Sequence, residues 1–436
     1  MAGLTIGKLC FGADAFAYGL ELCLARAARS AYRVTTATAG AVDVLLVTIF
    51  WYADYYRLEA FYRQSGIRPG GKPIIIIGGM QATMTPKLAA CFADYVFVGD
   101  ADEHLGGILD QIESGKRPEH PNLYRAGAGD LPSPCECEPS AFAIGTGSCH
   151  SSVRIEIARG CRFKCAFCCL SGLKPYKEVR ASEIEPLLQA HHGRALSLFA
   201  PERTMHSEFD RIVLAAKRYG CKDMGQDARL DRLEHVSGSS VTFGLEGLSQ
   251  RLRKTIGKPW SNAEVVERLG RFVETRKNIS RVSMYLIADL PGEMDDDWTE
   301  FRELFLEIER ADWSRRLVLC PILNPLSPKP YTALEKAHIR LFSDYASRWR
   351  RLLRKEGGQW GFRIIETFVW GPLERTMDAI VHRAPAEAAA WLIRRMPTPL
   401  LLRKPRMDAR EGVARALIAE IGKQEVTLNM LEGTAP

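Results

Sequence analysis

The feature of this chain that most limits how it can fold is the repeated succession of short apolar runs and longer helix-like segments. Residues 72–79 give the clearest example, since four consecutive isoleucines there are followed by two glycines. Such a run is too short to cross a membrane and is typical of a strand buried on both faces of a parallel sheet. Strands that alternate with helices predict an α/β fold with parallel sheets.

The alternation occurs in two separate stretches. Residues 1–116 predict a Rossmann-like parallel sheet, and residues 117–152, rich in Pro, Gly and Ser, predict a linker. Residues 153–335 predict a second αβ-alternating domain, and residues 336–436 a C-terminal α/β extension. The strands expected in the second domain lie at residues 153–158, 195–199, 222–226, 241–246, 282–288 and 317–321.

Length and composition limit the class of protein. The 436 residues suffice for two or three domains, and 46% hydrophobic and 25% charged residues indicate a globular chain. No apolar run is long enough to span a membrane and no secretory signal is evident, so we expect no membrane partner. The 12 cysteines are spread thinly, which indicates reduced thiols in a cytoplasmic protein.

Three of these cysteines are closely spaced directly after the strand expected at 153–158. Cys161, Cys165 and Cys168 form the pattern C-x3-C-x2-C. Three thiolates on one loop can hold three corners of an iron–sulfur cube and leave one iron open for a ligand. The alternative is a zinc knuckle, which wants four ligands, and no fourth follows at matching spacing. Cys169 lies outside the pattern, and we expect it to serve packing.

The spacing, with Phe167 just before the last cysteine, resembles the signature of the radical S-adenosylmethionine (SAM) enzymes. The resemblance implies a [4Fe–4S] cluster on Cys161, Cys165 and Cys168, with SAM on the open iron. It further implies reduction by a donor such as flavodoxin or ferredoxin, and cleavage of SAM to a 5′-deoxyadenosyl radical that takes hydrogen from substrate. The six strands of residues 153–335 would then form the family's partial (β/α)6 barrel.

Active sites of barrels lie at the carboxyl ends of the strands, and the resemblance implies SAM contacts there. Glu202 would pair with the ammonium group of SAM, although a glutamate that merely begins a helix is equally compatible. Arg229 would pair with the carboxylate. Glu246 would accept the ribose hydroxyls, unless it is only an ion-pair partner of a neighbouring basic residue such as Arg229. Ile287 belongs to the stretch that contacts adenine, where Asp289 stands in place of the family's usual glycine.

Residues 77–86 and 93–100 resemble the cobalamin-binding domain found in one branch of this family. The resemblance leaves two alternatives open: methyl transfer through cobalamin, or direct radical chemistry with this domain as scaffold. His104 lies in a D-x-H-x-x-G pattern that supplies a cobalt ligand in many cobalamin proteins. The pattern here follows the double glycine instead of preceding it, so we interpret His104 as a surface helix residue.

The linker holds further ligand types in Cys135, Cys137, Cys149 and His150. They could bind zinc or an auxiliary cluster, but the spacing matches no pattern we know. We favour free thiols in a loop that covers the active site.

The C-terminal quarter carries most of the net charge of +7, since residues 335–436 contain 18 basic and 12 acidic residues. Basic residues beside aromatics grip nucleobases, so radical modification of a nucleobase in RNA or DNA is an alternative function. Core aromatics under an ordinary basic surface explain the pattern equally well. A non-catalytic iron–sulfur regulator is a third hypothesis, which the SAM-type strand ends disfavour. The aromatic residues on which the nucleobase alternative depends are Trp349, Trp360, Phe362 and Trp370.

The sequence identifies neither the substrate nor the oligomeric state.

Overall fold

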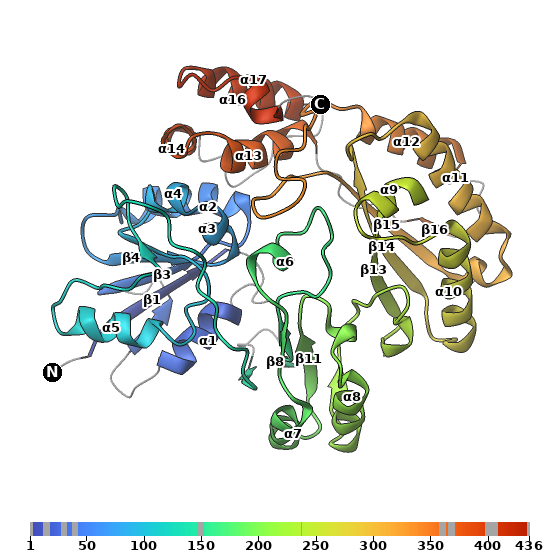
Figure 1. Ribbon diagram of the computed structural model, residues 1–436, viewed down its shortest axis with the longest axis horizontal. Helices are drawn as coiled ribbons and strands as arrows, with labels where there is room; N and C mark the ends of the chain where they lie inside the picture. The colour runs from blue at the N-terminus through green and yellow to red at the C-terminus, as the bar shows by residue number, and fades with distance from the viewer. Residues whose placement is uncertain are drawn as a thin grey trace. The chain divides into compact units, whose positions relative to one another are not determined.

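A computed structural model describes residues 3–11, 18–27, 33–36, 42–145, 152–236, 238–356, 363–364, 371–396 and 409–433. The chain divides into two compact units (Figure 1). The first comprises Met1–Glu138 and Thr376–Glu432, and the second Pro139–Arg375 with Gly433–Pro436. In the described part of the chain no helix is both long enough and apolar enough to cross a membrane.

The first unit is built on a six-stranded sheet in the order β2-β1-β3-β4-β5-β6. The first five strands are parallel and β6 is antiparallel to β5. The order 2-1-3-4-5 is that of a doubly wound α/β fold, which confirms the expected parallel sheet. The strands are β1 (Thr5–Cys10), β2 (Arg33–Thr36), β3 (Val44–Thr48), β4 (Ile74–Gly78), β5 (Tyr95–Phe97) and β6 (Leu123–Tyr124).

Helices cover this sheet on both faces (Figure 1). On one face α1 (Tyr18–Ala27) and α5 (Leu105–Glu113) pack against alternate residues of the central strands, including Val44, Leu46 and Ile76. On the other lie α2 (Tyr52–Ser65), α3 (Met80–Met84) and α4 (Pro86–Ala90). All five residues of β3 are therefore buried, as the apolar run predicts. The sequence analysis missed β1 and β2, because Gly7 and Lys8 interrupt the apolar pattern of β1.

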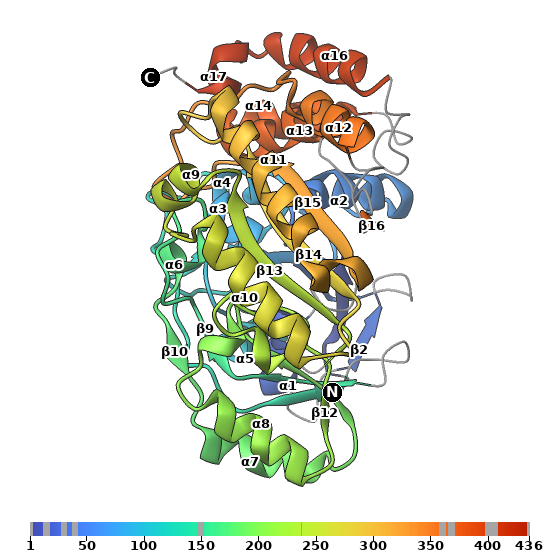
Figure 2. The same ribbon diagram turned by 90° about the vertical axis from the view of Figure 1, so that its right-hand side faces the viewer.

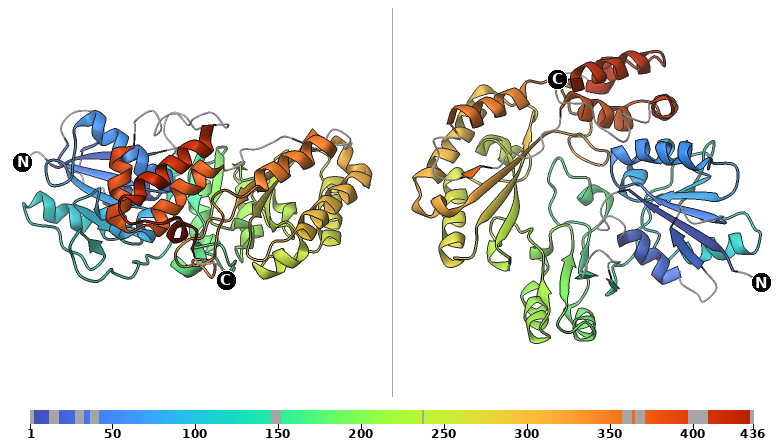
Figure 3. Two further views of the ribbon diagram at one scale, coloured as in Figure 1. Left: turned by 90° about the horizontal axis from the view of Figure 1, so that it is seen from above. Right: turned by 180° about the vertical axis from the view of Figure 1, so that it is seen from behind.

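The C-terminal helices of residues 376–432 belong to this first unit. Helix α14 (Ala386–Arg395) contacts α2, α4 and α16 (Arg410–Gly422), and Figure 3 shows these red helices beside the blue helices of the unit. The contact is also polar, because Arg63 Nη1 in α2 donates to the Met396 carbonyl at 2.6 Å. The expected extension of 336–436 is thus shared between the units. The division falls inside α13 (Pro372–Arg383), and α17 (Leu428–Glu432) follows α16.

In its described residues the second unit contains the six expected strands, which run parallel in chain order, and a seventh parallel strand, β16, at one edge, whereas β7 at the other edge is antiparallel. They lie in two four-stranded sheets, β12-β11-β8-β7 and β13-β14-β15-β16, which a parallel bridge between Asp227 and Thr242 joins. Every strand expected in residues 153–335 is present, as in a partial barrel. The six are β8 (Ser152–Glu156), β11 (Ala195–Phe199), β12 (Lys222–Asp223), β13 (Ser240–Gly247), β14 (Arg281–Ala288) and β15 (Val318–Pro325), with β7 (Ala143–Gly145) and β16 (Arg363–Ile364) at the edges.

Helices of the second unit cover one side of these strands. Helices α7 (Ala181–Ala190) and α8 (Phe209–Arg218) pack against β8 and β11 in one core. Helices α10 (Asn262–Thr275) and α11 (Asp295–Arg310) run across β13–β15 (Figure 2). Every second residue of β13 is buried and the others are only half-buried. The strand face opposite the helices is therefore the one available to ligands.

The basic helix α12 (Tyr345–Glu356) turns its aromatic residue inward. Trp349 is fully buried against Phe301 and Phe305. Trp349 therefore offers no surface for stacking a nucleobase. The other aromatics invoked for that alternative, Trp360, Phe362 and Trp370, lie outside the described residues.

Candidate active site

The cysteine loop follows β8 and is closed at its base. Arg159 Nε and Nη2 donate to the two carboxylate oxygens of Glu156 at 2.9 and 2.6 Å, and both residues are buried. The short strand β9 (Ala158–Arg159) then pairs antiparallel with β10 (Lys177–Glu178). The bidentate Glu156–Arg159 ion pair fixes the start of the loop that carries the three cysteines. The pairing of β9 with β10 holds the two ends of this loop together.

Two glycines let other backbone segments approach this loop closely. Gly160 has φ +71°, and a Cβ there would overlap the Pro175 carbonyl. Gly257 has φ +82° and lies against the backbone of Lys164 and Cys165. Beside it, Ala166 N–H donates to the Ile256 carbonyl at 3.1 Å. The loop is therefore held beside the segment that follows β13.

The three thiols form one half-buried group whose charges influence one another. Burial raises the pKa of each thiol, that of Cys168 to about 12. The charges of Lys258 and Arg229 oppose this rise for Cys161 and Cys165. Within the described residues these thiols are not gathered tightly enough to share one metal ion, whereas a cube needs ligands spread over separate corners. The donor set and its cationic neighbours fit a [4Fe–4S] cluster.

Two further expected contacts lie at or near the loop. Glu202 precedes the short helix η2 (Arg203–Met205) and accepts a hydrogen bond from Thr204 Oγ1 at 2.7 Å. Its charge contributes to raising the pKa of Cys161, after burial, so it lies within electrostatic reach of that thiol. Phe167 is half-buried within the loop. These contacts are equally those of a glutamate that begins a helix.

Arg229 is held in place by both charge and stacking. Its Nε and Nη2 donate to the carboxylate of Asp231 at 2.9 and 3.1 Å. Its guanidinium lies 4.1 Å from the ring centre of Phe163, in the cysteine loop, and 5.3 Å from that of Trp260. Arg229 is thus oriented beside the loop, and its ion-pair partner is Asp231 and not Glu246.

Glu246 ends β13 in a strained backbone conformation. Its φ is +70°, rare for a non-glycine residue, and the pairing register with β14 shifts between Gly244 and Glu246. The carboxylate lies over Gly244, where any Cβ would collide with it. Burial raises its pKa to about 7, although the charge of Lys258 opposes the rise. Within the described residues the carboxylate makes no hydrogen bond, which suits a group that waits for hydroxyl donors.

Asp289, after β14, occupies a conformation that usually demands glycine. Its φ is +57°, which explains the glycine that the family places there. The buried carboxylate accepts hydrogen bonds from Ser343 Oγ and Arg375 Nη2, both at 2.7 Å, and from Arg340 Nη2 at 3.2 Å. These bonds offset the backbone strain. The sequence analysis missed these three partners, since they lie 51 to 86 residues along the chain.

The face of the strands opposite the helices carries Ile287, which the sequence analysis selected, and two further side chains that it did not select, Tyr285 and Phe199. Tyr285 is 44% exposed, between buried neighbours in β14. Ile287 lies two residues further on the same face and is half-buried. Phe199, at the end of β11, is also exposed. Burial raises the pKa of Tyr285, and the charges of Asp227 and Glu246 add to the rise, so these groups are neighbours.

Comparison with known proteins gives the class of this part of the chain. Residues 155–305 match the family model described as the Radical SAM superfamily. The match begins in β8 and ends in α11, and so includes the cysteine loop and the ends of the first five barrel strands. The chain contains a radical SAM domain, as the resemblance of its cysteine motif implies.

Two curated relatives match parts of the chain. An uncharacterized protein of Methanocaldococcus jannaschii is 24% identical over 233 residues, which are 48% of this chain and 49% of that protein. The bacteriochlorophyllide d C-8(2)-methyltransferase of Chlorobaculum tepidum is 31% identical over 108 residues, 23% of each protein. The chain thus spans about half the length of the first relative and less than a quarter of the second.

Solved structures give weak overall similarity. The cobalamin-dependent S-adenosylmethionine radical enzyme OxsB, with aqua-cobalamin bound, has a TM-score of 0.48 and 10% sequence identity, over 98% of this chain and 80% of OxsB. Streptococcus suis SuiB, bound to the precursor peptide SuiA, has a TM-score of 0.34 and 13% identity, over 50% of this chain and 49% of SuiB.

Proposed function

We propose that this protein is a radical SAM enzyme, which uses a [4Fe–4S] cluster on Cys161, Cys165 and Cys168 to cleave SAM and modify an unactivated carbon of its substrate. The observation that carries the proposal is the position of these thiols on one closed loop of a domain of this class. When bound, the cluster and SAM supply the 5′-deoxyadenosyl radical that removes hydrogen from carbon.

The protein's own residues bind and orient in this scheme. Arg229 and Lys258 place positive charge beside the loop and stabilise the thiolates. Glu202 pairs with the ammonium group of SAM, and Arg229 with its carboxylate. Glu246 accepts the ribose hydroxyls. Such positioning matters because a displacement of about 1 Å of the reacting carbon can cost a hundredfold in rate.

Apolar contacts complete the proposed SAM site. Ile287 packs against adenine, and Phe167, within the cysteine loop, packs beside the cluster. The barrel is assigned to residues 153–335, and the linker assigned to residues 117–152 includes β6 of the first unit's sheet and β7 of the second unit. The proposed partners are a small-molecule substrate and a reductant such as flavodoxin or ferredoxin, in the cytoplasm, where free thiols such as those of the eleven described cysteines persist.

Methyl transfer through cobalamin is the second candidate. In its favour, the first unit has the doubly wound strand order that binds cofactors at strand ends, and one relative is named as a methyltransferase. Against it, the space beside Gly79 is filled by the Ile49 carbonyl, so this glycine serves the chain's own packing. Among the described residues, apart from the immediate chain neighbours, none lies within 4 Å of the Cβ position of Gly78.

Two anaerobic measurements test the two candidates, the first of them the formation of 5′-deoxyadenosine. Purified protein with a reconstituted cluster is incubated with SAM and dithionite, and 5′-deoxyadenosine is measured by mass spectrometry. We expect 5′-deoxyadenosine from the wild type and none from Cys161→Ala. An intact cluster that never yields 5′-deoxyadenosine would contradict the proposal.

The second measurement concerns cobalamin. A corrin absorption spectrum that remains after incubation with hydroxocobalamin and gel filtration would favour methyl transfer, and its absence would favour direct radical chemistry.

A further inference from the structure

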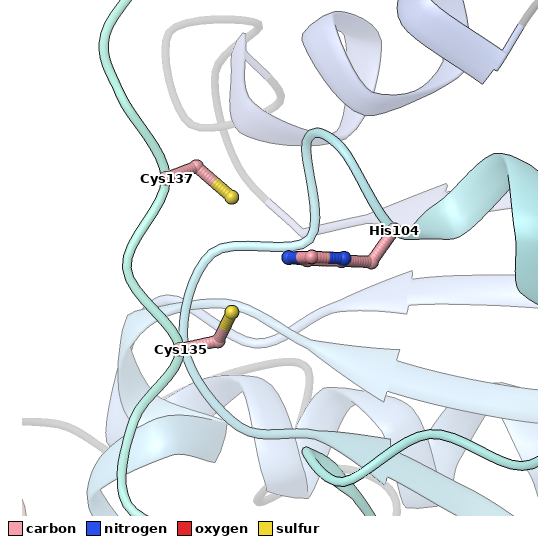
Figure 4. Close-up of side chains that lie close together, drawn as sticks. All are labelled: His104, Cys135 and Cys137. Atoms are coloured by element: carbon pink, nitrogen blue, oxygen red, sulfur yellow. The ribbon is translucent and has the colours of Figure 1, made fainter.

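A second group of metal-ligating side chains lies in the first unit. His104, Cys135 and Cys137 offer one ring nitrogen and two Sγ atoms that all lie within 4.8 Å of one another. Figure 4 shows both sulfur atoms turned toward the imidazole. His104, which the sequence analysis interprets as a surface helix residue, is half-buried at the N-cap of α5. Cys137 is buried, and Cys149 lies outside the described residues.

Backbone hydrogen bonds hold Cys135 in place, and Cys137 Sγ donates to the Asp100 carbonyl at 3.4 Å. Cys135 N–H donates to the Val98 carbonyl at 2.9 Å, and its own carbonyl accepts from Asp100 N–H at 2.9 Å. Gly99, with φ +104°, has no room for a Cβ against the Cys135 backbone. The segment therefore extends along the end of β5. Side chains two residues apart on an extended segment point to the same side, so both thiols face the turn that leads into α5.

Aromatic contacts limit the orientation of His104. Its ring centre lies 4.6 Å from that of His120 and is stacked on Phe97 at 6.0 Å. His120 is itself oriented, because its Nδ1 accepts the N–H of Asn122 at 3.1 Å. The three candidate ligands are thus supported by their surroundings before any ion arrives, which is the usual arrangement around a metal centre.

We propose that His104, Cys135 and Cys137 bind one Zn²⁺ ion in the first unit. Zinc–sulfur bonds of about 2.3 Å and zinc–nitrogen bonds of about 2.0–2.1 Å in a tetrahedron place ligand atoms roughly 3.5–4 Å apart. The three ligand atoms lie within 4.8 Å of one another, so they would need to move closer by up to roughly 1 Å. Thiolate and imidazole ligands select zinc over magnesium or calcium. Both thiols release a proton to solvent on binding, and water takes the fourth position.

Such an ion would join the linker to the sheet. It would tie residues 135–137 to the turn between β5 and α5, and so stabilise the first unit in proportion to its binding. It would also commit the His104 ring to zinc, which removes it as a ligand for cobalt. The inference uses residues of the first unit alone and does not depend on the proposed radical chemistry.

The test must exclude metal held by the other cysteines. The parent protein is therefore the full chain with Cys161, Cys165 and Cys168 all replaced by Ala, expressed with zinc and passed through gel filtration with dilute EDTA. We expect about one zinc per chain by inductively coupled plasma mass spectrometry. Cys135→Ser, Cys137→Ser and His104→Gln should each weaken zinc binding by more than the roughly 10–100-fold that loss of an outer-shell partner costs.

Matched controls and a second probe complete the experiment. Cys91→Ser removes a half-buried thiol of the same unit that is outside the group, and it should keep the zinc. Added Co²⁺ should give a thiolate-to-cobalt charge-transfer band in the parent and in Cys91→Ser, but not in Cys135→Ser. Circular dichroism confirms that each variant is folded.

Three outcomes would overturn the inference. Zinc that EDTA strips from the parent as readily as from Cys135→Ser would indicate an adventitious ion only. Equal loss of zinc in Cys91→Ser would place the metal elsewhere. A mass two hydrogens lower in metal-free, freshly purified parent, abolished by Cys137→Ser, would reveal a Cys135–Cys137 disulfide in place of a metal site.

Discussion

The two units of this protein share the same alternation of strand and helix but differ in how they bury their strands. In the first unit every residue of β3 is buried, because helices cover both faces. In the second unit β13 buries only alternate residues. A sheet covered on both faces is all core, whereas a half-covered one keeps one face for ligands. We therefore expect substitutions in the first sheet to change stability and those on the open face of the second to change chemistry.

The largest expected effect is the loss of the iron–sulfur cluster when any one of its three cysteine ligands is replaced. Cys161→Ala, Cys165→Ala and Cys168→Ala should each abolish the cluster absorption near 400 nm and all 5′-deoxyadenosine formation, because two thiolates do not hold a cube through purification. Cys169→Ala is the matched control and should keep both. Loss of the cluster in Cys169→Ala alone would show that the ligand set is assigned wrongly.

A pair of strand substitutions tests the comparison directly. Ile77→Ala, at a fully buried position of β4, should lower the free energy of unfolding of the first unit by about 2–5 kcal/mol, since it leaves a cavity. Tyr285→Ala, on the open face of β14, should cost less than about 1 kcal/mol. Hydrogen exchange of the amides in each sheet measures both values. Equal destabilisation by the two substitutions would contradict the contrast between the sheets.

Glu246 provides a test that concerns binding instead of folding. Glu246→Gln should keep the cluster and weaken SAM binding, because a charge-assisted hydrogen bond of about 1.5–3 kcal/mol is lost. This corresponds to a roughly 10- to 150-fold higher Kd, measurable by isothermal titration under anaerobic conditions. A variant with unchanged Kd and a changed melting temperature would mean that Glu246 serves the fold only.

The smallest expected effect is a dependence on pH from the same carboxyl group. Because burial raises the pKa of Glu246 to about 7, the folded state binds more protons than the unfolded state between about pH 4.5 and 7. Its contribution to stability is therefore complete below about pH 4.5 and lost as pH rises through 7.

SAM binding should change in the opposite direction. The ionised carboxylate is the stronger acceptor, so affinity should rise as pH increases from 6 to 8. Melting temperatures and Kd values at several pH values measure the two trends, and Glu246→Gln should flatten both. A wild-type protein whose SAM affinity is constant across this range would separate Glu246 from the binding site.

Local patterns were sufficient to predict much of this protein. The apolar run of β4 and the six strands of the second unit appear where the sequence predicts them, because burial on one or both faces imposes a periodicity that survives in the sequence. The cysteine loop is equally local, since its three thiols lie within eight residues. The position of Glu246 near the cysteine loop is predicted from the order of the strands, because the carboxyl ends of barrel strands meet at one edge.

Only the tertiary structure could decide which distant residues meet. Asp289 depends on Arg375, 86 residues later, and no local pattern records that contact. The backbone conformations of Glu246 and Asp289 are likewise invisible in sequence, because strain at a residue is sustained by its surroundings. His104 looked like a surface residue from its helix position. It joins Cys135 and Cys137 because hydrogen bonds at Val98 and Asp100 bring the linker back along the sheet.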